Sequence, residues 1–547
     1  MLLAVVDPGL AETTGPLPDE VEVETCLRIM AQARAAHPAD PRWAAVHDAA
    51  AHLYRAGKKA RKASRHAERR RRDLEATAAS ARHRDQDPAS VAPDRRDQAP
   101  RPLASEAGSA PVAPDHRAAP GGEPAPDQAR AEPPDHRITP HRPDAQAAPS
   151  GEPAPDQARA EPPGHRVVAR RSDGGVASAR RSLVGARRCY VCKGAYRLVH
   201  PEYHLLCPDC AEENAVRRYA RCDLRGRRAV VTGGRVKIGF QLTLKLLRDG
   251  AEVLVTTRFP RDAARRLAAV PDAADWLDRV HVHGVDLLDL AAVAGLLESV
   301  RKFGSLDVLI NNAAQTIRRP PAYHRETRAA EDVPLSGTAA RIDVAGVRRT
   351  LGTLAELPMP GSPRRDTLET FFPPGRTDET GQPLDLRDRN SWSLRLHEVD
   401  PAEWLEVQLV NSFAPFLLTS RLREPLEASP WPDRYVVQVS AMEGSFSRAH
   451  KTVRHPHTNM AKAALNMLTR TAAADYAASG IYMNSVDTGW VTDERPHPDK
   501  TAQREAGFRP PLDVIDGAAR VYDPIVRGVG GERMSGLFLK DYRPVEW

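Results

Sequence analysis

At 547 residues the chain is long enough for two or three domains and a large hydrophobic core. Its net charge of +7, from 79 basic and 72 acidic residues, is small for this length and argues against an obligatory polyanionic partner. No stretch reaches the roughly 18 apolar residues of a membrane-spanning helix, and the short apolar start lacks the basic segment of a signal peptide, so we expect a cytoplasmic protein with no membrane partner.

Residues 1–84 are predicted to form an N-terminal helical region with a basic end. Apolar residues recur at helical spacing from Val21 to Met30 and again from Trp43 to Tyr54. Nine lysines and arginines then follow between residues 58 and 72. A nucleic-acid-binding surface would explain this charge, but no aromatic residues are interleaved with it. We therefore favour the solvated face of a helix and expect no nucleic-acid partner.

Residues 85–183 are predicted to form a disordered linker. The segment is rich in Pro, Ala, Asp and Arg and has almost no large apolar residues, so it cannot bury enough surface to offset the entropy of ordering. The sequence GEPAPDQARAEPP at 122–134 recurs unchanged at 151–163. Neither copy carries the apolar positions that a stacked repeat needs, so we interpret them as duplicated linker.

Residues 184–226 are predicted to form a small zinc ribbon. Cys189 and Cys192 form one C-x-x-C pair and Cys207 and Cys210 a second, with a short stretch between them suited to a hairpin. Each pair presents two thiolates at a separation that tetrahedral Zn²⁺ accepts, and four cysteines leave no open coordination position. We therefore expect a structural zinc ion, and we expect its removal to destabilise the ribbon while the larger domain stays folded.

Strands and helices alternate from residue 227 to 547, which predicts an α/β fold with a doubly wound parallel sheet. The candidate strands are 228–232, 252–257, 280–285, 306–311, 434–440, 481–486 and 535–539. The alternation is interrupted at about 315–402, where the sequence is rich in Pro, Arg and Asp. An insertion of this size is typical of a lid or a partner surface, or stays partly disordered.

The first strand of this half is followed by a glycine-rich turn. Gly233 and Gly234 end the apolar run, Gly239 follows, and an apolar pattern at helical spacing leads to a second buried strand. Strand, glycine turn, helix and strand form the unit that presents a helix N-terminus to a pyrophosphate. This context predicts a nucleotide-binding site.

Residues 227–547, apart from the insertion, resemble the short-chain dehydrogenase/reductase family. The glycine motif of the family is matched at Thr232, Gly233 and Gly239, although Lys237 stands where the middle glycine belongs. Further matches are the adenine-side aspartate at Asp286, the turn Asn311, Asn312, Ala313 and Ala314, the helix asparagine at Asn411, and the late turn at Thr488, Gly489 and Thr492.

The resemblance implies a dinucleotide bound along a Rossmann-like sheet. The residues that it implies for the cofactor are Thr232, Gly233, Gly234, Arg235, Lys237, Ile238, Gly239, Arg258, Asp286, Leu287, Asn312, Ala313, Ala314, Lys462, Gly489 and Thr492. An acidic residue after the second strand would select NAD, but this chain has Arg258 there. Arg258, aided by Arg235 or Lys237, suits the 2′-phosphate of NADP, so we favour NADP over NAD.

The predicted active site departs from the family. Lys462 matches the family lysine, but Thr458 occupies the position of the tyrosine that transfers the substrate proton, and a threonine hydroxyl is too weak an acid for that role. Asn411 is a further expected catalytic residue, and the family serine falls on Ser440 or one residue later, on Ala441. The candidate replacement proton donors are His455, His457, Tyr323 and Tyr476, of which His457 is the first to test because it precedes Thr458.

Two functions remain open at this point. The first is an NADP-dependent oxidoreductase that transfers hydride at a carbonyl or alcohol carbon of a small molecule, whose identity the sequence does not give. The alternative is a catalytically inactive NAD(P)-binding scaffold whose zinc ribbon recruits partners. The resemblance also implies a homodimer or homotetramer, because relatives commonly pair through the helices that carry Asn411 and Lys462.

Overall fold

The computed structural model describes residues 18–37, 40–78, 80–81, 181–346, 370–448 and 451–547. Residues 85–180 of the predicted linker therefore lie outside the described residues. Strand β1 (Arg181–Arg188) begins two residues before the predicted end of the linker at residue 183. Residues 347–369 of the predicted insertion also lie outside them.

The predicted N-terminal helices are confirmed as α1 (Glu20–Ala35) and α2 (Ala44–Ala78). Helix α1 begins at a capping box, in which Asp19 accepts a hydrogen bond from the Glu22 amide at 2.8 Å and Glu22 accepts one from the Asp19 amide at 3.1 Å. The basic residues of α2 are exposed, as expected for a solvated face. Near its end, α2 contacts β1, where Asp73 accepts a hydrogen bond from the Val184 amide at 2.7 Å.

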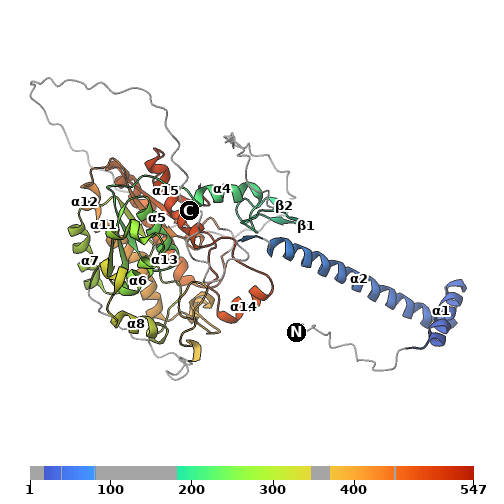
Figure 1. Ribbon diagram of the computed structural model, residues 1–547. Coiled ribbons are helices and arrows are strands. Elements are labelled where there is room, and N and C mark those ends of the chain that lie inside the picture. Colours follow the sequence, from blue (N-terminus) through green and yellow to red (C-terminus); the bar gives the residue numbers. More distant parts are fainter. Residues whose placement is uncertain (1–17, 38–39, 79, 82–180, 347–369, 449–450) are drawn as a thin grey trace, which may run out of the picture. The chain divides into compact units, whose positions relative to one another are not determined.

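A nine-stranded sheet forms the frame of the larger domain, and the predicted doubly wound α/β fold is confirmed (Figure 1). The strand order is β11-β10-β9-β8-β6-β3-β4-β5-β7, and only β11 runs antiparallel to its neighbour. The strands are β3 (Arg228–Thr232), β4 (Glu252–Thr257), β5 (Val280–Gly284), β6 (Val308–Asn311), β7 (Asp343–Ala345), β8 (Arg434–Ser440), β9 (Ile481–Asp487), β10 (Phe538–Lys540) and β11 (Arg543–Val545). Short edge strands β7 and β11 are not among the predicted strands.

Helices cover both faces of this sheet because its strands are apolar on both sides. On one face, α5 (Lys237–Arg248), α6 (Pro260–Ala268) and α15 (Val514–Val529) pack on side chains such as Val231 and Val255. On the other face, α7 (Leu290–Phe303), α11 (Ala414–Arg421) and α13 (Pro456–Ala478) pack on Val230 and Leu254. Among the described residues of the larger domain, the remaining α-helices are α8 (Arg325–Asp332), α10 (Pro401–Gln408), α12 (Arg423–Glu427) and α14 (His497–Glu505).

The described parts of the insertion are ordered on the sheet domain rather than separate from it. Strand β7 pairs with β5, and α8 contacts α6. The segment after residue 370 contains the short 3₁₀ turns Ser391–Ser393 and Leu396–Glu398. Asn390 donates a hydrogen bond to the Glu494 carbonyl at 3.1 Å, so this segment lies against the loop that follows β9.

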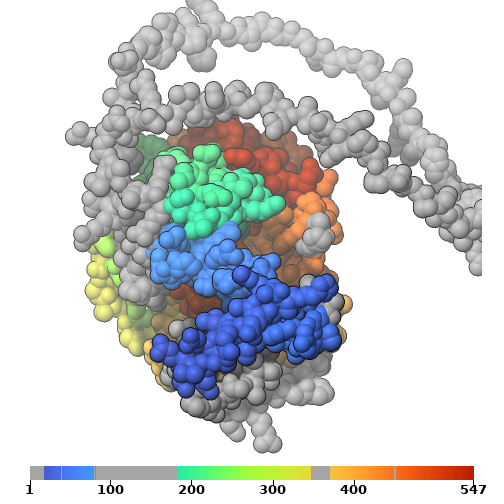
Figure 2. Space-filling model, turned by 90° about the vertical axis from the view of Figure 1, so that its right-hand side faces the viewer, coloured from blue at the N-terminus to red at the C-terminus, as the bar shows by residue number. Residues whose placement is uncertain are grey.

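The cysteine-containing ribbon consists of an antiparallel hairpin, β1 and β2 (Ala195–Val199), and helix α4 (Pro208–Arg218). Helix α4 packs on α15 of the larger domain. In Figure 2 the green residues of the cysteine-containing ribbon lie beside red residues of the C-terminal part of the chain. Buried Arg218 forms ion pairs with Asp513 at 2.7 Å and Asp516 at 2.9 Å. These contacts favour a shared loss of stability, whereas the sequence predicts that metal removal destabilises the ribbon and leaves the larger domain folded.

Candidate cofactor cleft and four-cysteine site

A cleft of about 1040 Å³ runs along the carboxyl ends of the parallel strands, where doubly wound sheets bind ligands. The predicted cofactor residues that line it are Gly233, Arg235, Lys237, Ile238, Gly239, Arg258, Asp286, Leu287, Asn312, Ala313, Ala314, Lys462, Gly489 and Thr492. Thr232 and Gly234 do not line it and lie behind its wall. The structure thus brings the implied residues together, and their contacts with a cofactor stay a prediction.

The glycine turn between β3 and α5 needs its glycines for two different reasons. Gly233 has a φ of 70°, in the left-handed region that side chains disfavour. Gly239 leaves no room for a side chain, since a Cβ there would lie 2.2 Å from the Gly233 carbonyl oxygen. The turn therefore brings the first turn of α5 close to the end of β3, at the edge of the cleft.

Thr232 acts from behind the cleft on the turn that follows β6. Its hydroxyl accepts hydrogen bonds from the amides of Asn312 at 2.9 Å and Ala313 at 3.0 Å. The Asn312 side chain donates in return to the carbonyls of Thr232 at 2.9 Å and Gly233 at 3.2 Å. These bonds fix the two cleft-lining turns against each other, so Thr232 is a supporting residue rather than part of the cleft surface.

Lys237 occupies the middle-glycine position with a φ of 54°. Its amine donates to the Glu494 carboxylate at 3.1 Å, which connects α5 to the loop after β9. Burial alone would lower the pKa of Lys237, but Glu494 and Asp378 more than offset it and the pKa lies above its usual value. Burial raises the pKa of Glu494, but the charge of Lys237 lowers it, and the resulting pKa is about 2.

Positive charge gathers at the end of the cleft beside β4. Arg258 is exposed there, with its guanidinium 5.7 Å from the Phe259 ring centre. Arg235 is buried and forms an ion pair with Asp262 at 2.6 Å. Burial, followed by the charges of Arg258, Arg235 and Arg328, lowers the pKa of nearby His324 to about 2. This end of the cleft therefore disfavours additional positive charge and suits an anion.

Lys462 and Ser440 both line the cleft. The Lys462 amine donates to the Val439 carbonyl at 2.7 Å. Burial lowers the pKa of Lys462 to about 8, although Glu443 opposes the shift. Ser440, at the end of β8, donates to the Asn466 side chain at 2.6 Å, and the alternative residue Ala441 also lines the cleft.

Asn411 lies outside the cleft lining, in a π-helical segment, Leu409–Phe413, between α10 and α11. Its side chain accepts a hydrogen bond from the Gln315 amide at 2.6 Å and donates to the Gln315 carbonyl at 3.0 Å. These bonds position the chain just after Ala314. The structure therefore indicates a supporting role for Asn411 and not direct contact with a substrate.

The predicted replacement for the family tyrosine needs correction. Thr458 lines the cleft, and its buried hydroxyl has no hydrogen-bond partner among the described residues. His457 does not line the cleft, because its ring is directed toward α10, with Nε2 3.4 Å from the Glu403 carboxylate. Successive helix residues point about 100° apart, which explains why His457 and Thr458 face different neighbours.

Among the other candidate donors, His455 and Tyr323 line the cleft and Tyr476 does not. His455 stacks on Trp392 with ring centres 3.9 Å apart, and burial lowers its pKa to about 4, against a hydrogen bond with Asn459 that raises it. Burial raises the pKa of Tyr323, although Arg319 opposes this shift. The Tyr476 hydroxyl donates to the Thr419 carbonyl at 3.1 Å, away from the cleft.

Sequence reasoning missed the contribution of the ribbon to the cleft. Tyr190, within the first cysteine pair, and Lys193, just after it, line the cleft together with Lys540 from the end of β10. The only relevant signal in the sequence was that both residues lie within or beside a C-x-x-C turn. Such a turn fixes the cysteines but does not reveal where its other side chains point.

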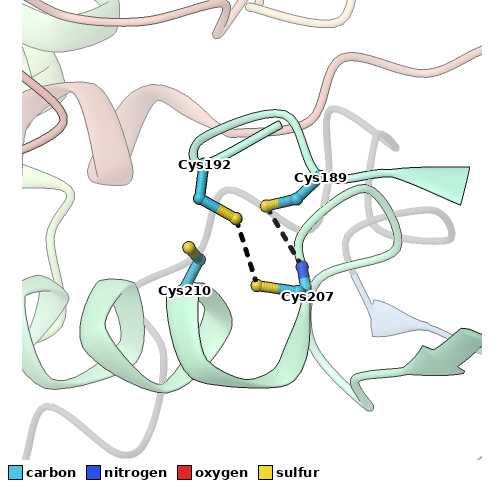
Figure 3. Close-up of side chains that lie close together, drawn as sticks. All are labelled: Cys189, Cys192, Cys207 and Cys210. Atoms are coloured by element: carbon cyan, nitrogen blue, oxygen red, sulfur yellow. Dashed lines mark hydrogen bonds between the residues drawn. The ribbon is translucent and has the colours of Figure 1, made fainter. Parts of the chain in front are cut away.

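The four predicted zinc ligands lie together, as Figure 3 shows, with their sulfur atoms all within 4.8 Å of one another. The sulfur atoms of Cys192 and Cys207 are 3.7 Å apart. Four thiolates about 2.3 Å from a tetrahedral zinc ion would lie about 3.8 Å from one another. Cys207 and Cys210 stand at the start of α4, and the Cys207 amide donates to the Cys189 sulfur at 3.3 Å. The cluster therefore fits a bound metal ion.

Comparison with known proteins decides the family. The model described as short chain dehydrogenase matches residues 227–334, and the model described as Enoyl-(Acyl carrier protein) reductase matches residues 389–506. An uncharacterised protein of Acanthamoeba polyphaga mimivirus is 34% identical over 352 residues, which cover 62% of this chain and 71% of that protein. The chain belongs to the short-chain dehydrogenase/reductase family. It therefore contains an oxidoreductase-type domain of that family.

Named relatives match over shorter stretches. Carbonyl reductase 1 (NADPH) of Sus scrofa is 35% identical over 115 residues, and a probable oxidoreductase of Streptomyces lividans is 42% identical over 91. These matches cover 20% and 17% of this chain, and they span 39% and 29% of the two relatives. The NADPH-bound carbonyl reductase structure from chicken fatty liver covers 59% of this chain and all of its own, at 18% identity and a TM-score of 0.38.

Within the described residues, no helix is long and apolar enough to cross a membrane.

Proposed function

We propose that the chain is an NADP-dependent oxidoreductase that transfers hydride at a carbonyl or alcohol carbon of a small molecule. One observation carries the proposal: a single cleft is lined by the glycine turn, Ser440 and Lys462. The family membership of the chain supports the same reaction class. A scaffold without activity has little physical need for a buried lysine in such a cleft.

The cleft residues divide along its length by what they offer a dinucleotide. The turn at Gly233 and Gly239, with the N-terminus of α5, suits the pyrophosphate, and Asp286 with Leu287 suits the adenine. The Lys462 amine is the group that would bind the nicotinamide ribose. Gly489 and Thr492 would border the carboxamide. When bound, NADP supplies the hydride.

NADP is favoured over NAD by the charge beside β4. Arg258 stands at the end of that strand, where an acidic residue would favour NAD. The low pKa of His324, which reflects burial and the surrounding arginines, points to the same positive field. A 2′-phosphate would be attracted by this field, whereas a ribose hydroxyl would gain little from it.

The proton needed by the reaction is assigned to Lys462. A useful general acid has a pKa near the working pH. The pKa of Lys462, about 8, is closer to neutrality than that of His455, about 4. Tyr323, with its pKa raised by burial, is a weaker acid than an ordinary tyrosine. Lys462 would thus bind the ribose and exchange the proton.

Titration of the full-length protein with NADPH and NADH tests the cofactor. We expect tighter binding of NADPH, and we expect Arg258→Ala to weaken NADPH binding about tenfold or more while NADH binding is unchanged. Arg421→Ala, at an exposed arginine of α11, is the matched control and should alter neither. Equal losses for both dinucleotides in Arg258→Ala would exclude a role in 2′-phosphate recognition.

Consumption of NADPH with a panel of aldehydes, ketones and quinones tests the activity. We expect slow turnover that Lys462→Met abolishes and His457→Ala leaves intact. The inactive scaffold is the second candidate, and Thr458 at the tyrosine position is the observation that favours it. NADPH binding without turnover across the whole panel would support the scaffold and exclude the enzyme.

We also propose that the four cysteines bind one structural zinc ion. Their four sulfur atoms offer a complete ligand set, so no position is left for a substrate. Elemental analysis of the purified protein should give one zinc per chain and much less in Cys207→Ser. A stoichiometric metal content dominated by iron would replace zinc with an iron–thiolate site.

A further inference from the structure

The first cysteine pair carries a side chain into the cofactor cleft. Tyr190, between Cys189 and Cys192, lines the cleft, and its hydroxyl accepts a hydrogen bond from the Trp490 amide at 2.9 Å. The same hydroxyl lies 3.4 Å from the position that a Cβ of Gly489 would occupy. Tyr190 therefore contacts the turn after β9 on the side where Gly489, at a φ of 77°, allows close approach.

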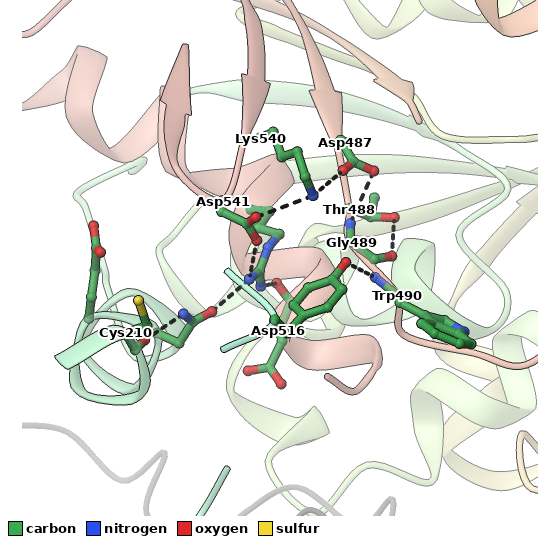
Figure 4. A network of polar contacts seen from close by, with 12 residues as sticks. Cys210, Asp487, Thr488, Gly489, Trp490, Asp516, Lys540 and Asp541 are labelled. Carbon is green, nitrogen blue, oxygen red and sulfur yellow. Dashed lines mark hydrogen bonds and ion pairs between the residues drawn. The ribbon is translucent and has the colours of Figure 1, made fainter. Parts of the chain in front are cut away.

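The second cysteine pair reaches the same turn through a chain of polar contacts (Figure 4). Asn214 on α4 donates to the Cys210 carbonyl at 2.7 Å and accepts from Arg520 at 2.7 Å. Arg520 continues to Asp541 at 3.0 Å, and Lys540 links Asp541 at 3.2 Å to Asp487 at 2.9 Å.

The last contact of this chain enters the turn itself. Asp487, at the end of β9, accepts a hydrogen bond from the Gly489 amide at 3.3 Å. Arg520, Asn214 and Asp541 are all buried. Buried, mutually bonded groups of this kind resist displacement, because each would leave a partner unsatisfied. Both cysteine pairs are thus braced against the turn that begins at Thr488.

We propose that the four-cysteine metal site positions the Thr488–Thr492 turn for dinucleotide binding, with Tyr190 as the positioning residue. Metal occupancy and dinucleotide affinity are then coupled. The inference rests on the proposed function, because it assumes that this turn borders the bound dinucleotide. Coupling between two binding sites is reciprocal at equilibrium, so the dinucleotide also raises the affinity of the four cysteines for the metal.

The chain offers a matched pair of substitutions. Tyr190→Phe removes the hydroxyl that accepts from Trp490 and keeps the ring. Tyr196→Phe, in strand β2 of the same ribbon, removes a hydroxyl that donates to the His204 carbonyl at 2.8 Å, and Tyr196 does not line the cleft. Both variants lose one tyrosine hydrogen bond, so a general loosening of the ribbon affects both.

The experiment measures the NADPH dissociation constant, the zinc content and the zinc dissociation constant by equilibrium competition with a chromogenic chelator, each in the full-length protein. For the wild type we expect zinc to bind about threefold or more tightly at saturating NADPH. For Tyr190→Phe we expect full zinc content, NADPH binding weakened about three- to tenfold, and little effect of NADPH on the zinc dissociation constant. Tyr196→Phe should retain the wild-type NADPH affinity and the wild-type effect of NADPH on zinc binding.

The outcomes separate this inference from the proposed function. If the wild type binds neither NADPH nor NADH, the coupling and the proposed function are both overturned. Wild-type binding that Tyr190→Phe leaves unchanged, or a zinc dissociation constant that ignores NADPH, would overturn the coupling alone. Equal weakening by Tyr190→Phe and Tyr196→Phe would also overturn it, because the effect would then belong to the ribbon as a whole.

Discussion

Lys462 is a buried amine whose position in the cleft costs stability near neutral pH. Burial lowers its pKa from 10.5 to about 8. The unfolded chain therefore binds more protons than the folded chain between these two values, and stability rises with pH across that window. In Lys462→Met this contribution is absent. We expect the wild type to gain about 1–2 kcal/mol of unfolding free energy relative to Lys462→Met between pH 7.5 and 9.5.

Urea unfolding of both proteins at the two pH values measures this difference. Lys302→Met, at an exposed lysine on α7, controls for the loss of one positive charge. A wild-type stability that falls relative to Lys462→Met over the same range would contradict a depressed pKa. It would also remove the physical basis for Lys462 as the proton source.

Thr458 offers a test of the missing phenol. Thr458 lines the cleft one helical turn before Lys462. A tyrosine at this position would place a phenol beside the lysine, and general acid catalysis contributes about 10²–10⁴-fold to a rate. We expect Thr458→Tyr to raise NADPH-dependent turnover at least about tenfold. Thr458→Phe adds the same ring without the hydroxyl, and equal activity of the two variants would count against the prediction.

At the scale of elements, apolar runs and glycines were the informative signals. The strands expected at 228–232 and 252–257 are β3 and β4, because each is a continuous apolar run that ends at a turn. Strands β7 and β11 have three residues each and are largely exposed, so no periodicity marks them. Strand β7 depends on pairing with β5, which lies far from it in the sequence. Strand β11 depends on pairing with β10, from which a tight turn separates it.

The candidate site was predictable where spacing alone sets position. Thr458 and Lys462 are four residues apart on one helix, so both line the cleft. The direction of the His457 side chain depends on where α13 begins and on which element packs beside that helix. In the structure the His457 ring is directed toward α10. The contribution of Tyr190 was beyond sequence reasoning, because it depends on how the ribbon docks on the turn after β9.

The start of α5 contains a testable strain. Lys237 adopts a φ of 54°, a region that costs a residue with a side chain about 1–2 kcal/mol. Lys237→Gly and Lys237→Ala both remove the ion pair with Glu494. The difference between their free energies of unfolding therefore reports the backbone strain at this position. We expect the glycine variant to be about 1 kcal/mol more stable than the alanine variant by urea unfolding. Equal stabilities would mean that the turn relaxes at no cost.

For the whole molecule, the ribbon and the sheet domain share one set of buried contacts. Arg218 and Arg520 connect α4 to α15 and to the end of β10. We therefore expect Cys207→Ser to lower a single unfolding transition of the sheet domain by about 5 °C or more, rather than to produce a separate ribbon transition. Differential scanning calorimetry measures this. Cys26→Ser, at an exposed cysteine of α1, is the control, and an unchanged main transition would restore the independent ribbon.

Self-association is the last property that the surface predicts. Helix α13 contacts α10, α11 and the π-helical segment between them, and these elements expose large apolar side chains, namely Trp404, Leu405, Phe413, Phe416, Met460 and Met467. A clustered apolar surface of this kind is typical of an interface, so we expect a homodimer or homotetramer in solution. Phe416→Asp should shift the mass in sedimentation velocity toward the monomer, because it would bury a charge. Val216→Asp, at an exposed valine of α4, should leave the mass unchanged. A monomeric wild type, or an assembly that tolerates Phe416→Asp, would place any interface elsewhere.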